Sequence, residues 1–471
     1  MKLISGQQIL KTRDDHAPVL LQREAEGPDP RNPFRLGPDA DCSWLKSDEA
    51  CGPEKLRPRI EPWLTALVQS EHLSLLVGSG LTHAVNGLAT EEALPGMNAI
   101  SFGILDEEIA AEAKRAAERA GRDSGNFEDQ IRAANELLRG LEIIASTKAA
   151  DAQEQKQIRS LREGLTKALG FFAGSILEGE RHLVAAPAEK RAQAFNYLVS
   201  FLMSFASRSG TRERLHLFTT NYDRYVEAGA DVAGLRLIDR FVGTLAPVFR
   251  ASRLDVDLHY NPPGIRGEPR YLEGVARFTK LHGSVDWVDC DRTIRRIGLP
   301  LGAEDAAPYL AAPALEGADA MRLMIYPNAA KDRETAAHPY VELFRDFAAA
   351  ICRPNSTVVC YGYGFGDEHI NRVLEDMLTI PSAHLVVIAR GDPLGRIMGT
   401  YERLGRRAQI TLLIGDHLGD LRTLVDHYLP KPAIDRTTFR MAELLKARWN
   451  PGQGEGDRER MASADEVGTD E

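Results

Sequence analysis

An apolar stretch that breaks into glycines is the feature that most restricts the fold of this 471-residue chain. Residues 72–77, HLSLLV, are mostly apolar, the turn GSG follows at 78–80, and a polar run compatible with a helix continues to Gly87. This order predicts a buried strand that turns sharply into a helix. The turn has two interpretations: it holds a phosphate or nucleotide in front of the helix, or its glycines only make a tight corner.

Further apolar runs repeat this pattern of a strand followed by a polar segment. Segments with helical spacing lie between them, and strands that alternate with helices predict a mainly parallel sheet. We therefore expect an α/β protein with a doubly wound, Rossmann-like sheet. The predicted strands after the first lie within 215–223, 277–287, 322–327, 356–378, 384–390 and 409–415.

A helical block at about 90–210 interrupts the strands. Its runs are rich in Ala, Glu, Lys and Arg, which favour helices, and Asn126 is a candidate N-cap. We expect a large helical subdomain that is inserted into the sheet domain or packed beside it. The Pro-, Asp- and Gly-rich residues 1–59 predict an extended arm with little regular structure. The remaining divisions are a main domain at 60–430 and a C-terminal helix with a disordered tail at 431–471.

The composition excludes several classes of protein. The formal net charge of −10 argues against nucleic-acid binding over the whole surface, although a local basic patch stays open. None of the five cysteines belongs to a Cys-x-x-Cys pair, so we expect no structural zinc and reduced thiols in the cytoplasm. The longest apolar run, 197–207, is too short to span a bilayer, so we expect no membrane partner.

Four predicted strands end in polar or Gly-rich segments: 78–82, 219–223, 281–287 and 362–369. Ligands of an open α/β sheet bind beyond the carboxyl ends of its strands, so these four segments could converge on one site. Each segment alone is a weak signal. Their joint occurrence in this order favours a binding site.

The order of GSG, TNYD, LHGS and GYGFGD along the chain resembles the nucleotide-binding fingerprint of the sirtuin-like family. The resemblance spans roughly Leu73 to Gly415 and is interrupted by the helical block. It is strongest to the sirtuin-like proteins of bacterial antiphage defence, in which NFED, LIDRFVG and GYGFGDEHI also recur. Unlike sirtuin deacylases, the chain has no zinc ribbon, and the helical block takes the place of the small cofactor-binding module. The resemblance therefore implies cleavage of NAD rather than deacylation of lysine.

The resemblance also assigns roles to side chains at the strand ends. His282 would be the general base that acts on a ribose hydroxyl or on water, a task that suits an imidazole. Asn221 would hold the nicotinamide ribose and an attacking water, and Asp223 would hydrogen-bond the carboxamide of nicotinamide. The alternatives are an Asx turn for Asn221 and Asp223, and a capping or core position for His282.

Small residues complete the expected NAD site. Close approach of backbone N–H groups to the pyrophosphate is the role expected of the GSG turn, and Gly283 would let the chain turn near the ligand. Asp367 is expected to be the N-cap of the next helix, and His369 to be a capping or core histidine. Besides His282 and Asn221, the residues expected to bind NAD are Gly78, Ser79, Gly80, Thr82, Thr220, Asp223, Gly283, Gly362 and Gly364.

Three functions stay open at this point. The first is an antiphage NAD glycohydrolase that releases nicotinamide and ADP-ribose without a metal. It would be gated by assembly or by a partner, because unrestrained cleavage of NAD is toxic. The second is a non-catalytic scaffold subunit that binds NAD or ADP-ribose, and the third is a zinc-independent protein deacylase. The resemblance also implies a homo-oligomer. Of the two partners found with such proteins, a HerA-like hexameric ATPase matches this chain better than an Argonaute does.

Overall fold

The computed structural model describes residues 6–12, 15–24, 31–38, 40, 42–90, 94, 100–119, 125–147, 152–208, 212–252, 256–260, 270–290, 293–315, 318 and 339–431. The chain divides into two units, residues 1–429 and 430–471, and the architecture below belongs to the first. The strand predicted at 322–327 lies outside the described residues. So do the C-terminal helix and tail predicted at 431–471, except for Lys431 itself.

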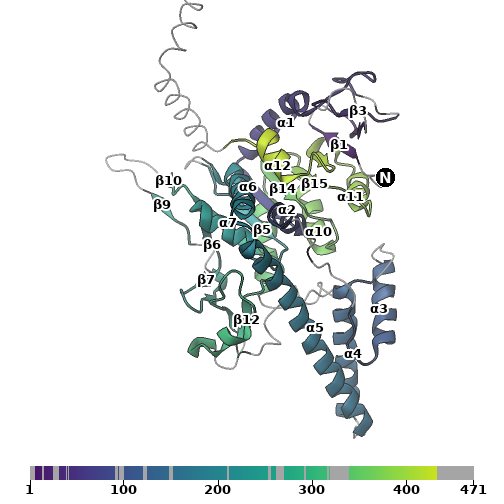
Figure 1. Cartoon of the computed structure of the whole chain (residues 1–471), viewed down its shortest axis with the longest axis vertical. Coiled ribbons are helices and arrows are strands. Elements are labelled where there is room, and N and C mark those ends of the chain that lie inside the picture. Colours follow the sequence, from purple (N-terminus) through teal and green to yellow (C-terminus); the bar gives the residue numbers. More distant parts are fainter. Residues whose placement is uncertain are drawn as a thin grey trace, which may run out of the picture. The chain divides into compact units, whose positions relative to one another are not determined.

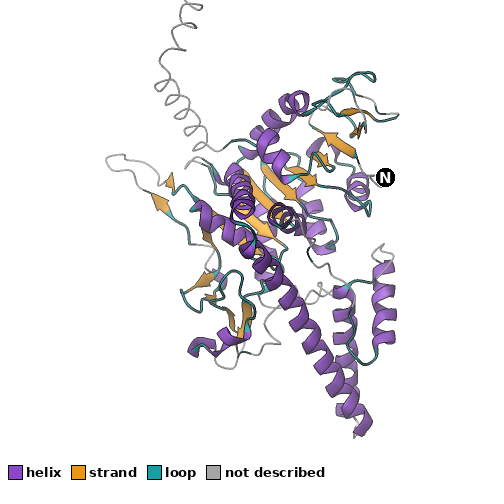
Figure 2. Cartoon of the chain, in the orientation of Figure 1, coloured by secondary structure: helices purple, strands orange, loops and turns teal. Residues whose placement is uncertain are grey.

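A ten-stranded mixed sheet lies at the centre of the first unit, with its strands drawn in orange between purple helices in Figure 2. Neighbouring strands pair in parallel except at one edge, where three strands are antiparallel. This confirms the α/β class and the mainly parallel sheet. In spatial order the strands are β3 (Phe34–Leu36), β2 (Val19–Arg23), β1 (Gln7–Lys11), β16 (Ile410–Ile414), β15 (His384–Ala389), β14 (Ser356–Tyr361), β4 (His72–Val77), β5 (His216–Thr219), β11 (Val275–Lys280) and β6 (Arg236–Ile238).

Helices cover both faces of the parallel part of the sheet. Leu75 and Val77 of β4 join one hydrophobic core, and Leu76 of the same strand joins the other. Because both faces are buried, the strands read as continuous apolar runs. The helices of the first core are α1 (Pro53–Val68), α2 (Ser79–Ala89), α6 (Ala188–Ala206), α7 (Tyr225–Ala233) and α12 (Leu421–Thr423), and those of the second are α9 (Tyr340–Ile351), α10 (Glu368–Leu378) and α11 (Arg396–Leu404).

The strand order reverses between β4 and β14. After β4 the chain builds β5, β6 and β11 on one side of it, and it then crosses to the other side for β14, β15 and β16. Ligands of open parallel sheets bind beyond the carboxyl ends of the strands at such a reversal. The loops that follow β4, β5, β11 and β14 carry the polar segments identified in the sequence.

The N-terminal residues belong to the sheet, which differs from the extended arm predicted for 1–59. β1 pairs with β16, and β2 and β3 continue the sheet beyond it. Ile9, Leu10 and Leu21 on these strands are buried. The strands are only 5, 5 and 3 residues long, so their apolar pattern is too short to recognise in the sequence. The edge of β16 supplies the backbone partners that hold them.

The helical block predicted at about 90–210 is a helical region of α3 (Asp106–Arg119), α4 (Phe127–Thr147), α5 (Ala152–Ala185) and α6. α3, α4 and α5 are neighbours, and they share a hydrophobic core that also includes Tyr222, Val285 and Val288 (Figure 1). Asn126 caps α4 as predicted: its Oδ1 accepts the N–H of Asp129 at 3.0 Å, and the Asp129 carboxylate accepts the N–H of Asn126 at 2.9 Å. This reciprocal pair satisfies donors that the first helical turn leaves unbonded.

Small antiparallel sheets and short helical turns fill the connections. The turn after β11 leads directly into one of these sheets. Across the described ranges, no helix is long and apolar enough to cross a membrane, and all five cysteines are free thiols. The sheets are β12 (Trp287–Cys290), β13 (Thr293–Arg296), β8 (Val248–Phe249) and β7 (Phe241–Val242), and β10 (Arg270–Tyr271) with β9 (His259–Tyr260); the turns include η2 (Ala307–Ala311), η3 (Pro313–Leu315), η5 (Arg407–Gln409) and η6 (Leu424–Tyr428).

Candidate active site

The GSG turn after β4 packs against the loop after β14. The N–H of Gly78 donates to the carbonyl of Tyr361 at 3.0 Å, and the N–H of Gly80 donates to the carbonyl of Gly362 at 3.0 Å. A Cβ on Gly80 would lie 2.5 Å from the Cα of Gly362, and Gly362 itself has a φ of +62°. Glycine is therefore required here for the approach of two backbones to each other. This differs from the expected role, in which these N–H groups approach a pyrophosphate.

The glycines of the β14 loop differ in what constrains them. Gly362 contacts Gly80, whereas a Cβ on Gly364 would meet nothing within 4 Å. A Cβ on Gly366 would lie 2.8 Å from the guanidinium of Arg396. Packing within the protein therefore accounts for Gly362 but not for Gly364, which leaves Gly364 as the glycine of this loop with room beside it.

Asn221 joins the loops after β4 and β5. Its Nδ2 donates to the carbonyl of Gly78 at 2.9 Å and to Oγ1 of Thr82 at 2.9 Å. The hydroxyl of Thr82 donates to Oδ2 of Asp223 at 2.6 Å, and the N–H of Thr220 donates to the carbonyl of Val77 at 3.1 Å. The structure thus brings together four of the predicted site residues in one hydrogen-bonded cluster.

The Asx turn considered for this segment is present only in part. The N–H of Tyr225 donates to Oδ1 of Asp223 at 3.1 Å, which is the two-residue step of such a turn. Asn221, by contrast, bonds across to another loop rather than to the backbone two residues ahead. The amide of Asn221 therefore connects the loop after β5 to the loop after β4.

A buried ion pair holds the segment after Asp223. The guanidinium of Arg224 contacts the carboxylate of Glu180 on α5, and the side chain of Glu180 is 0% exposed. The same carboxylate accepts the backbone N–H of Arg224 at 2.9 Å. Burial raises the pKa of the Glu180 carboxyl, and the hydrogen bonds and charge of Arg224 oppose that shift. The helical region is thereby fixed to the loop that carries Asn221 and Asp223.

Lys280 supports the same loop from β11. Its ammonium donates to the carbonyl of Asp223 and, at 2.9 Å, to the carboxylate of Glu227. The Lys280 side chain is 1% exposed, so this is a buried charge with two partners. The sequence carries no signal for Lys280, because a lysine inside a strand gives no sign of where its ammonium lies.

His282 follows β11 two residues after Lys280 and is 7% exposed. Gly283 has a φ of +84°, so the turn after the histidine requires a residue that tolerates the left-handed region. The ring of His282 lies 6.3 Å, centroid to centroid, from that of Tyr222, and the N–H of Val285 donates to the carbonyl of Tyr222 at 3.0 Å. The loops after β5 and β11 are therefore in direct contact, as the pairing of their strands requires.

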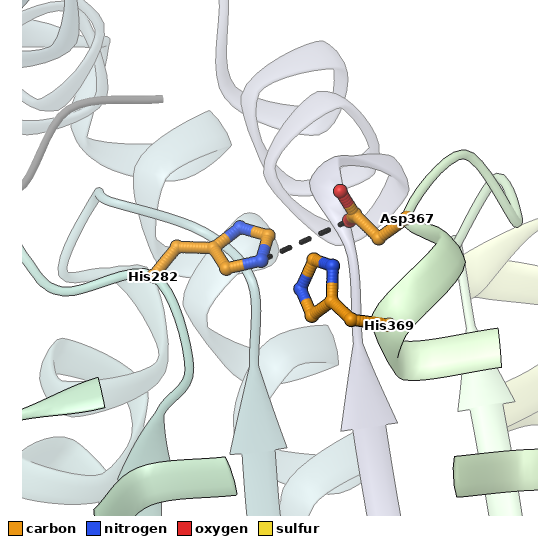
Figure 3. Close-up of side chains that lie close together, drawn as sticks. All are labelled: His282, Asp367 and His369. Carbon is orange, nitrogen blue, oxygen red and sulfur yellow. Dashed lines mark ion pairs between the residues drawn. The ribbon is translucent and has the colours of Figure 1, made fainter. Parts of the chain in front are cut away.

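Two residues of the β14 loop lie beside His282, and Figure 3 shows all three side chains together. Nε2 of His282 is 3.9 Å from Oδ2 of Asp367, and the rings of His282 and His369 are 5.8 Å apart between centroids. Asp367 is the N-cap of α10 as predicted, and its carbonyl accepts the N–H of Asn371 at 3.0 Å, but its side chain makes no capping hydrogen bond. His369 packs edge-on against Phe344 and also faces His282, which the expectation of a core or capping histidine missed.

The sequence did contain a signal for Asp367 and His369. Both belong to the segment 362–369, which is one of the four polar strand ends, and the rule for carboxyl ends applies to them as it does to His282. The sequence could not show that the end of β11 lies close to the start of α10, because only the fold brings these two elements together.

No model of a known protein family matches the chain, and no curated protein matches it. The class of protein therefore has to be argued from the fold and the geometry of the site. It is an α/β protein that gathers an asparagine, an aspartate and histidines beyond the carboxyl ends of parallel strands.

Proposed function

We propose that this protein is an NAD glycohydrolase that cleaves the bond between nicotinamide and ribose. One observation carries the proposal: Asn221 and His282 follow the adjacent parallel strands β5 and β11, beside the turn that opens α2. The strand-end motifs whose order resembles that of sirtuin-like NADases thus follow the carboxyl ends of parallel strands in one sheet. On this proposal the finer architecture is a doubly wound, Rossmann-like domain with the nucleotide at its topological reversal.

The pyrophosphate would lie at the N-terminus of α2. Because the N–H groups of Gly78 and Gly80 are bonded within the protein, the interaction comes from the N–H of Ser79 and the positive end of the helix dipole. The hydroxyl of Thr82 completes this end of the site. Gly364, which has room beside it, allows the nucleotide to pass close to the β14 loop.

The reaction consumes one water. The bond between C1′ of the ribose and the nicotinamide nitrogen breaks, and its electron pair neutralises the pyridinium nitrogen of the leaving group. The water oxygen bonds to C1′, and His282 accepts the proton that the water loses. Asn221 holds the ribose and the water, while Asp223 accepts a hydrogen bond from the carboxamide of nicotinamide. Fixed dipoles around the sugar stabilise the oxocarbenium-like transition state.

Assembly would control such an enzyme, because free hydrolysis of NAD would kill the cell. We propose a homo-oligomer in the cytoplasm that acts in antiphage defence beside a HerA-like hexameric ATPase. The buried pair Glu180–Arg224 supports gating, since it connects the helical region to the loop of Asn221 and Asp223. A change in the position of α5 would therefore move that loop.

The experiment is nicotinamide release from NAD by the purified chain, alone and with its assembly partner. His282→Ala should lower the rate by about 100- to 10,000-fold, the usual contribution of a positioned base, and Asn221→Ala should also abolish most turnover. His83→Ala, an exposed histidine on α2 near the site, is the control and should keep full activity. Undiminished turnover in both site variants would contradict the proposal.

A non-catalytic scaffold that binds NAD or ADP-ribose is the second candidate, and one observation favours it. Nδ2 of Asn221 donates both of its hydrogen bonds within the protein, to Gly78 and Thr82, which is the pattern of a structural asparagine. Calorimetry separates the two candidates: NAD binding without nicotinamide release, in the assembled complex, would favour the scaffold. Protein deacylation has no comparable observation in its favour.

A further inference from the structure

The cluster of His282, Asp367 and His369 has the composition of a metal site. Each residue offers one ligand atom, and these atoms all lie within 4.8 Å of one another. We propose that the three side chains form a binding site for a divalent transition-metal cation, with Zn²⁺ as the best match. The turn after β11 supplies one ligand and the start of α10 supplies two (Figure 3).

The distances fit a site that closes on the ion. Zinc binds imidazole nitrogen at about 2.0–2.1 Å and carboxylate oxygen at about 2.0–2.2 Å, so two ligands of a tetrahedron lie about 3.4 Å apart. Nε2 of His282 and Oδ2 of Asp367 are 3.9 Å apart in the metal-free chain. The three ligand atoms lie within 4.8 Å of one another, so their spacing would have to shrink by up to about 1.4 Å when an ion binds.

The donor set selects the class of cation. Two imidazoles with one carboxylate suit Zn²⁺ and neighbouring transition metals, whereas Mg²⁺ and Ca²⁺ prefer shells of oxygen atoms. Three protein ligands leave a fourth position for water. His282 is largely buried, and Asp367 and His369 are partly exposed, so the ion can enter from the side of α10.

Binding of the cation would oppose the proposed reaction. A metal-bound imidazole has no lone pair with which to accept a proton, so His282 cannot hold an ion and act as the base at once. Zn²⁺ is therefore an inhibitor in this scheme, and the metal-free chain is the active form. This consequence rests on the proposed NADase function, but the binding of Zn²⁺ does not.

The test begins without NAD. The metal-free full-length chain is titrated with ZnCl₂ by calorimetry and with CoCl₂ by visible absorption. The expected result is about one ion per chain, with binding weakened about 100-fold or more by Asp367→Asn and by His369→Gln, because even partners outside the ligand shell cost about 10–100-fold. His83→Gln is the matched control and should bind as the unchanged chain does. Equal binding by all four proteins would overturn the site.

A second measurement uses the unchanged chain, so it does not depend on the folding of variants. Diethyl pyrocarbonate modifies accessible imidazoles, and mass spectrometry locates the modified residues. Zn²⁺ should protect His369, the more exposed of the two histidine ligands, while His83 reacts equally with and without the ion. Modification of His369 that Zn²⁺ leaves unchanged would contradict the proposal.

Activity then separates this inference from the proposed function. If both hold, Zn²⁺ at saturating concentration lowers nicotinamide release, EDTA restores it, and His369→Gln raises the Zn²⁺ concentration needed for half inhibition. If Zn²⁺ binds at the site but no condition gives nicotinamide release, the metal site stands and the NADase proposal fails. If nicotinamide is released but Zn²⁺ neither binds nor inhibits, the metal site fails and the NADase proposal stands.

Discussion

Two pairs of loops meet beyond the carboxyl ends of the strands, and different contacts hold them. The loops after β4 and β14 meet through the main chain, with Gly80 against Gly362. The loops after β5 and β11 share a main-chain hydrogen bond from Val285 to Tyr222. Side chains hold the β5 loop further: Asn221 bonds it to the loop after β4, Arg224 to α5 and Lys280 to β11. We refer to the first pair as the glycine loops and to the second as the polar loops.

The comparison separates stability from chemistry. The contact between Gly80 and Gly362 needs no side chain, so substitutions of these two glycines should act on folding. The polar loops present the amide of Asn221, the carboxylate of Asp223 and the imidazole of His282, so substitutions there should act first on ligand binding and turnover. Arg224 is the exception, because it is a buried charge that fixes a polar loop to the helical region. It should therefore give the largest loss of stability.

Arg224→Ala should lower the free energy of unfolding by about 3–5 kcal/mol, because it leaves the Glu180 carboxylate buried without its counter-charge. Urea denaturation measures the change. The matched control is Arg372→Ala, which breaks an ion pair with Glu368 on the exposed face of α10 and should cost about 0.5 kcal/mol or less. Similar losses in the two variants would mean that the buried pair does not hold the polar loop.

Gly80→Ala should lower the free energy of unfolding by about 1–3 kcal/mol, because the new Cβ would lie 2.5 Å from the Cα of Gly362 and the backbones must separate. Gly87→Ala is the control on the same helix, where a Cβ meets nothing within 4 Å. Alanine favours helices over glycine, so that variant should gain about 0.5–1 kcal/mol. If Gly80→Ala leaves the free energy of unfolding unchanged, the two glycine loops can move apart without cost. The proposed difference between the two pairs of loops would then be wrong.

The sequence predicted the polar loops better than the glycine loops, and the reason is physical. An apolar run that ends in TNYD or LHGS states both the strand and the chemistry at its end, so Asn221, Asp223 and His282 could be singled out in advance. The contact between Gly80 and Gly362 could not, because it depends on which strands become neighbours. The sequence suggested a phosphate as the reason for the glycines, and the fold supplied a second backbone instead.

The parts of the chain that the sequence missed also depend on neighbours. The strands at 7–11, 19–23 and 34–36 exist because the edge of β16 offers backbone partners, and nothing within their own few residues predicts that edge. Local rules correctly predicted Asp367 as a helix N-cap, but they could not predict that its carboxylate lies 3.9 Å from His282, which follows another strand. Local patterns predicted the parallel strands and the long helices, but not the three short edge strands or the contacts between distant residues.

The stability of the protein should also depend on pH, through His216 at the start of β5 rather than through the residues that follow its carboxyl end. Burial lowers the pKa of His216 from 6.5 to about 3. Below pH 6.5 the unfolded chain binds a proton that the folded chain does not, so stability is lost as the pH falls from 6.5 toward 3. Between pH 7 and pH 5 this histidine should account for a loss of about 2 kcal/mol.

His216→Gln removes that titration and is the measurement to make. The difference in urea midpoint between pH 7 and pH 5 should shrink in the variant, although His384 and His417, whose pKa values burial lowers to about 4, continue to titrate in the same direction. An unchanged difference would mean that the imidazole at the start of β5 is protonated in the folded chain. His216 would then be accessible to water rather than buried in the sheet.

Thr82 gives the smallest expected change in stability and the sharpest test of the comparison. Thr82→Val keeps the shape of the side chain but removes the hydroxyl that donates to Asp223 and accepts from Asn221. Because Thr82 is partly exposed, water can replace the lost partner, and we expect a loss of only about 1 kcal/mol in stability. Turnover should fall about 10-fold, equal to about 1.4 kcal/mol in the barrier, because both site residues lose their fixed position. Thr82→Ser, which keeps the hydroxyl, should retain activity; if the serine and valine variants turn over NAD equally, the hydroxyl does not organise the polar loops.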